Sequence, residues 1–63
     1  MNNYILILET IRKTTKAGLV EAERIYDLID ELWAPNWGEI EEIQVARMAI
    51  SAQQHMRLFK DVQ

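Results

Sequence analysis

Apolar side chains recur along this chain every three or four residues, which is the spacing of one face of an α-helix. In residues 3–16, Tyr4, Leu8 and Ile11 share such a face. The same segment begins with a short, partly β-branched run, so a β-strand is the alternative interpretation. We favour a helix, because the pattern continues through basic side chains to Gly18, where a helix-ending glycine is expected.

A second apolar face runs through residues 20–33 and stops before Pro35. Proline disfavours helical geometry at the residue before it, so this helix is expected to end near residue 33. Asn36 and Glu39, three residues apart, resemble a capping box with Asn in place of Ser or Thr. The pattern therefore predicts a third helix over residues 37–60.

These segments predict an all-α fold with one domain over residues 1–63. Two shorter helices and a long C-terminal helix would pack as a helical hairpin or bundle, with short turns at residues 17–19 and 34–36. The predicted core residues are Leu8, Ile11, Ile25, Ile29, Leu32, Ile43, Ala46, Ala49, Ile50 and Met56.

The third helix carries two adjacent apolar stripes, and its predicted length of roughly 33 Å exceeds what helices of about 14 residues can cover. A chain of 63 residues buries only about 60% of the surface that its unfolded form exposes. The chain also lacks cysteine, so neither a disulfide nor a thiolate zinc site can add stability. We therefore predict a homodimer. Its predicted interface is the stripe Val45, Ala49, Ala52, Met56 and Phe59.

The net charge of −3 is unevenly distributed. Residues 19–42 carry eight acidic side chains against Arg24, whereas residues 1–18 and 43–63 each carry three basic side chains against one acidic. An acidic middle repels phosphate backbones, so nucleic acid is not the expected partner. A helix-turn-helix centred on Gly18 would also need a recognition helix with fewer carboxylates.

Candidate catalytic groups are few. Ser51 and His55 are four residues apart and can touch on one helix, but no third residue is evident to orient the histidine. No metal-ligand constellation and no phosphate-binding glycine loop stand out. We therefore expect a protein that is not an enzyme and that binds no metal or cofactor.

The longest apolar run, YILIL at residues 4–8, is much shorter than the roughly 20 residues of a membrane-spanning helix. No secretory signal is visible. The absence of cysteine also fits a reducing compartment. We expect a soluble, cytoplasmic protein with no membrane partner.

Both tryptophans lie in the stretch ELWAPNWGEIEE, residues 31–42. Because Trp and Tyr are frequent in binding hot spots, Trp33, Trp37 and Tyr26 predict a protein-binding surface at the second turn. The alternative is that both tryptophans close the apolar end of a helical hairpin. Trp33 is in register with the second apolar face, so we expect it to be mostly buried and Trp37 to be the contact residue.

The acidic middle predicts a partner with a basic surface. The carboxylates expected to contact that partner are those of Glu23, Asp27, Asp30 and Glu31. The leading hypothesis is therefore a small, non-enzymatic protein-interaction module. The alternative hypothesis is a transcriptional regulator that binds DNA through the basic ends of a dimer.

The block LIDELWAPNWGEIEEIQVARMAIS, residues 28–51, together with the chain length, resembles the small helical accessory proteins of the early regions of lambdoid bacteriophages. The resemblance implies an early phage protein in the host cytoplasm. Such a protein would modulate host takeover or phage development by contact with other proteins rather than by catalysis. No single residue acquires a role from it.

Overall fold

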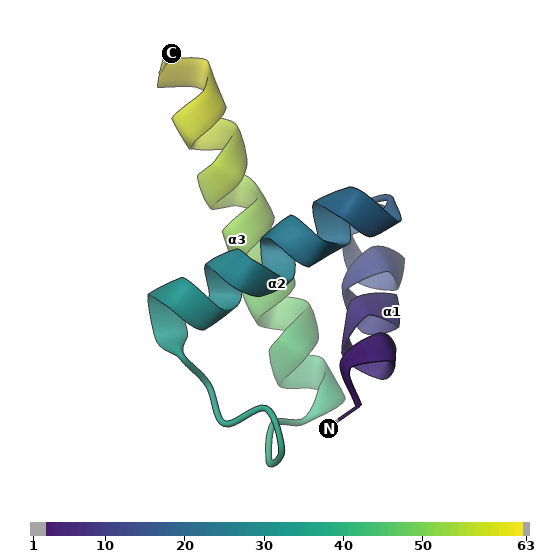
Figure 1. Ribbon diagram of the computed structural model, residues 1–63. Coiled ribbons are helices and arrows are strands. Elements are labelled where there is room, and N and C mark those ends of the chain that lie inside the picture. The colour runs from purple at the N-terminus through teal and green to yellow at the C-terminus, as the bar shows by residue number, and fades with distance from the viewer. Residues whose placement is uncertain (1–2, 63) are drawn as a thin grey trace.

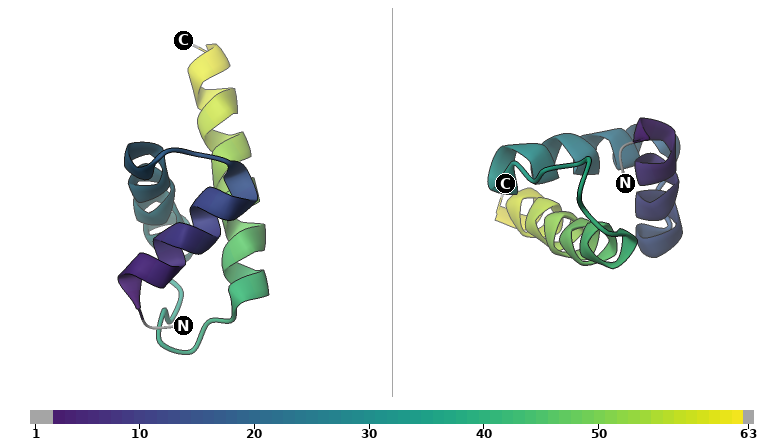
Figure 2. Two further views of the ribbon diagram at one scale, coloured as in Figure 1. Left: turned by 90° about the vertical axis from the view of Figure 1, so that its right-hand side faces the viewer. Right: turned by 90° about the horizontal axis from the view of Figure 1, so that it is seen from below.

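A computed structural model describes the backbone of residues 3–62 and the side chains of residues 3–58 (Figure 1). It contains the helices α1 (Tyr4–Thr15), α2 (Leu19–Trp33) and α3 (Glu42–Val62), each of which packs against the other two. α2 crosses α3, and α1 lies beside both (Figures 1 and 2). The predicted all-α fold is confirmed, and the first segment is a helix rather than a strand.

Side chains that hydrogen-bond to the backbone set both ends of α1. The Oδ1 of Asn3 accepts hydrogen bonds from the N–H groups of Ile5 (2.9 Å) and Leu6 (3.3 Å), which caps the start of α1. At its end, the hydroxyl of Thr15 donates to Ile11 O and accepts from the N–H of Ala17. Lys16 then takes the left-handed conformation, with φ 59°.

Gly18 was expected to take that left-handed position, and this expectation is wrong. Its φ is −75° and its ψ is 176°, so Gly18 is extended and directly precedes α2. α2 consequently begins at Leu19, and it ends at Trp33 as Pro35 predicts. The local bonds of Thr15 end α1 before the glycine is reached.

The predicted start of the third helix at residue 37 is also wrong. The Oδ1 of Asn36 accepts from the N–H of Gly38 (3.1 Å), and its carbonyl accepts from the N–H groups of Glu39 and Ile40, so Asn36 closes a tight turn. The reach-back bond of a capping box belongs instead to Gln44, whose Oε1 accepts from the N–H of Glu41 (3.0 Å). α3 therefore begins at Glu42, and the preceding loop buries Ile40.

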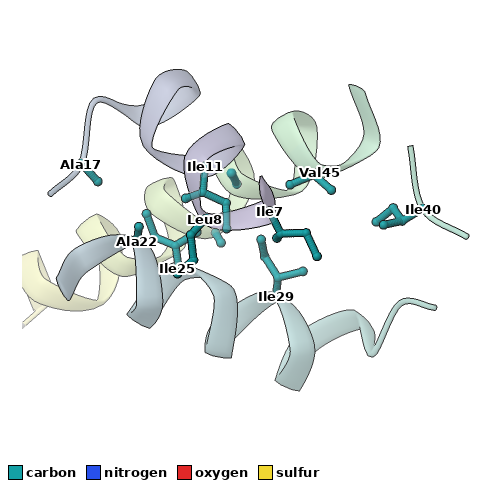
Figure 3. Close-up of a cluster of buried hydrophobic side chains, with 11 residues drawn as sticks. Ile7, Leu8, Ile11, Ala17, Ala22, Ile25, Ile29, Ile40 and Val45 are labelled. Atoms are coloured by element: carbon teal, nitrogen blue, oxygen red, sulfur yellow. The ribbon is translucent and has the colours of Figure 1, made fainter. Parts of the chain in front are cut away.

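The core is one cluster of aliphatic side chains from all three helices and the two connections (Figure 3). Of the ten predicted core residues, Leu8, Ile11, Ile25, Ile29 and Ala49 are buried. Ala46 and Met56 are partly buried. The complete set of buried hydrophobic residues is Ile7, Leu8, Ile11, Ala17, Ala22, Ile25, Ile29, Ile40, Val45, Ala49 and Ala52.

The other three predicted core residues, Leu32, Ile43 and Ile50, are exposed. On α3 the stripe that we expected at a dimer interface is the buried one: Val45, Ala49 and Ala52 are fully buried within the single chain, and of these only Ala49 was also predicted in the core. Small side chains let neighbouring helices approach closely, which explains why α1 and α2 pack on this stripe.

Two further members of the predicted interface lie toward the end of α3. Met56 is partly buried and packs against the core, and the side chain of Phe59 is outside the described residues. The C-terminal part of α3 extends past the other two helices (Figures 1 and 2).

Candidate interaction surface

Three aromatic rings from distant parts of the chain form a continuous row. Tyr4 at the start of α1 meets Tyr26 of α2 edge to face, with ring centroids 4.9 Å apart and an interplanar angle of 85°. Trp37, in the loop before α3, stacks on Tyr26 at 4.4 Å and 17°. Offset-stacked and edge-to-face pairs are both favourable arrangements of aromatic quadrupoles. The row therefore fastens the loop and the start of α1 to the middle of α2.

Carboxylates of α2 lie along this row. The indole Nε1–H of Trp37 donates a hydrogen bond to Oδ1 of Asp30 (3.1 Å). Glu23, Asp27 and Asp30 are spaced by four and three residues, which places them on one side of the helix, and all three are exposed. We call these six residues the aromatic–acidic surface: Tyr4, Tyr26, Trp37, Glu23, Asp27 and Asp30.

Burial and these carboxylates both raise the pKa values of Tyr4 and Tyr26. Desolvation raises the pKa of Tyr26, and the negative charge of Asp30 adds to the effect, followed by Tyr4 and Asp27. The pKa of Tyr4 is likewise raised, by desolvation first and then by Glu23 and Asp27. Desolvation and a neighbouring anion both disfavour the tyrosinate, which is why the shifts are upward. The carboxylate contribution, which is the smaller one, is the part that would favour a positive charge at this surface.

The raised pKa of Tyr26 predicts a loss of stability at alkaline pH. Its folded-state pKa lies above the reference value of 10.0, so its contribution is fully present below that value and is lost as pH rises through the folded-state pKa. The free energy of unfolding of the wild type, minus that of Tyr26→Phe, should fall over this range in urea titrations at successive pH values. A difference that stays constant through the tyrosine titration would contradict the prediction.

The structure brings together five of the seven residues predicted to bind a protein: Tyr26, Trp37, Glu23, Asp27 and Asp30. Trp33 and Glu31 are exposed on α2, and within the described part of the chain neither side chain forms a hydrogen bond or ring contact with the row. Sequence reasoning missed Tyr4 as a member, because it assigned this tyrosine to the apolar face of the first helix. Edge-on contact between Tyr4 and Tyr26 depends on how α1 packs against α2.

The two tryptophans have the opposite environments from those expected. Trp33 is 47% exposed, whereas Trp37 is partly buried against the core. Trp33 has the register of a core residue but is the last residue of α2. The turn closed by Asn36 folds Trp37 back onto Tyr26.

The structure also places the side chains that we considered for catalysis and for DNA binding. Ser51 and His55 are both exposed on α3. Arg12, Lys13 and Lys16 are exposed near the C-terminal end of α1, where a helix dipole favours cations. Among the side chains that the structure describes, no three His, Cys, Asp or Glu residues are close enough to hold a metal ion.

Within the described part of the chain, no helix is both long and apolar enough to cross a bilayer. Comparison with known proteins finds no matching family model, no similar curated protein and no similar solved structure.

Proposed function

We propose that this protein is a small, non-enzymatic interaction module whose aromatic–acidic surface binds a basic segment of another protein. The observation that carries the proposal is the alignment of the carboxylates of Glu23, Asp27 and Asp30 along the aromatic row. Arginine and lysine are attracted to aromatic faces, and a carboxylate beside the ring pairs with the same cation. One surface thus offers both interactions to a basic side chain.

The wider charge distribution supports the same partner chemistry. Eight of the ten acidic residues fall within residues 19–42, which contain α2, the loop after it and the first residue of α3. A field of one sign steers an oppositely charged partner and discourages phosphate backbones. We further propose that the contact serves the role implied by the resemblance to early phage proteins, in the host cytoplasm.

Binding of an arginine-rich peptide tests the proposal. In a Trp33→Phe background, Trp37 is the remaining tryptophan and its fluorescence reports on the aromatic row. We expect the peptide to change this fluorescence, and we expect Glu23→Gln with Asp27→Asn to weaken its affinity about tenfold, as two lost exposed charge pairs imply. Affinity capture from a host lysate with the same variants then seeks the natural partner.

The matched control is Glu21→Gln with Glu31→Gln, which removes the same charge from the same helix away from the row. Its affinity for the peptide should stay close to that of the parent. Equal losses in both double variants would mean that only net charge matters, which contradicts a site. Duplex DNA binding with a steep salt dependence would instead favour the regulator hypothesis.

A further inference from the structure

The side of α3 that faces away from the core carries a stripe of exposed apolar side chains, between which Arg47 and Gln54 lie. Ile43, Ile50 and Leu58 are 58%, 45% and 66% exposed. Their spacings of seven and eight residues place them on one side of the helix, roughly opposite the buried Val45 and Ala49. Neither α1 nor α2 covers this side. The stripe spans roughly 22 Å at 1.5 Å per residue.

A shallow groove of about 370 Å³ adjoins the N-terminal end of this stripe. It lies between α1 and α3, and α3 contributes Glu42, Ile43 and Ala46 to its lining. On the α1 side it is lined by Thr10, Lys13 and Thr14. An apolar side chain from another helix could therefore contact Ile43 and Ala46, next to the carboxylate of Glu42 at the start of α3.

α3 begins with an acidic residue, and an arginine lies near each end of the apolar stripe. Glu42 begins the helix, with Glu39 and Glu41 just before it, whereas the charged residues from there to residue 58 are Arg47 and Arg57. If a second copy of α3 lies antiparallel across a two-fold axis near Ile50, Glu42 of each copy meets Arg57 of the other. The same register places Leu58 of each copy against Ile43 and the groove of the other. A parallel pair would instead bring like charges together.

We propose that the outer face of α3 binds a second copy of this chain in antiparallel orientation. Across the axis Glu42 pairs with Arg57 and Ile43 with Leu58, as a two-fold interface requires, while the Arg47 side chains of the two copies flank the axis. This interface replaces the buried stripe of Val45, Ala49 and Ala52, which is occupied within the single chain. It is separate from the aromatic–acidic surface, so the proposed function does not depend on it.

Sedimentation velocity over a series of protein concentrations tests the interface. The wild type should form a concentration-dependent dimer, and Ile50→Glu should raise its dissociation constant at least about tenfold, because a charge replaces apolar surface at the axis. The matched control is Val20→Glu on α2, which replaces a side chain that is 66% exposed and lies outside the proposed interface. A wild type that stays monomeric at the highest concentration, or equal effects of both variants, would overturn the proposal.

Charge reversal tests the orientation. Glu42→Arg and Arg57→Glu should each dissociate the dimer, because each creates two like-charge pairs across the axis. Mixing the two variants should restore dimers, since both cross-axis pairs in the mixed species again join opposite charges. Circular dichroism verifies that each variant is folded. A mixture that remains monomeric while both variants are folded would exclude the antiparallel arrangement.

Discussion

Ile25→Ala is expected to leave the chain largely unfolded at room temperature. Ile25 is fully buried and is directed toward Leu8 and Ile11 of α1 (Figure 3). Truncating a buried isoleucine to alanine costs about 2–5 kcal/mol, since the apolar contacts are lost and a cavity remains. A single core of this size rarely supplies more than about 3–5 kcal/mol of net stability. Thermal and urea unfolding followed by circular dichroism measures the loss.

Ile43→Ala is the matched control, because the periodic pattern alone assigns Ile43 and Ile25 equally to the core. Ile43 is 58% exposed, so its truncation should change the free energy of unfolding by no more than about 0.5 kcal/mol. The measurement should use concentrations at which the chain is monomeric. A loss comparable to that of Ile25→Ala would show that the outer face of α3 is packed within the monomer.

Trp37→Ala is expected to destabilise the fold by about 2 kcal/mol, and Trp33→Ala by about 1 kcal/mol or less. Trp37 stacks on Tyr26, donates to Asp30 and packs against the core. Its removal would also release the loop that carries the buried Ile40. Trp33 is 47% exposed at the end of α2, and its indole makes no hydrogen bond or ring contact with the side chains that the structure describes. Urea unfolding of both variants, monitored by circular dichroism, gives the comparison.

Two milder substitutions separate the contributions of Trp37. Trp37→Phe keeps an aromatic ring over Tyr26 but loses the donor to Asp30, so it should cost about 1 kcal/mol. Asp30→Asn keeps an acceptor oxygen for the indole and should cost less than that. A greater loss from Trp33→Ala than from Trp37→Ala would contradict the observed positions of the two side chains.

Local chemistry was sufficient to predict several features from the sequence. The three-to-four-residue spacing of apolar side chains predicts the three helices, because it matches the 3.6 residues per turn of an α-helix. Pro35 predicts the end of α2 at Trp33, since its ring restricts the preceding residue. Tyr26, Trp37 and Asp30, which we placed in one binding surface from the sequence, lie together at the second turn, and their role in binding stays a prediction.

The tertiary structure decided which of several locally equivalent choices applies. Both stripes of α3 have helical spacing, and only the packing of α1 and α2 determines that Val45 and Ala49 are buried while Ile43 and Ile50 are exposed. The same packing brings Tyr4 to Tyr26 and sets the aromatic row. Periodicity identifies residues that share a face, but the crossing of the helices determines which face meets a neighbour.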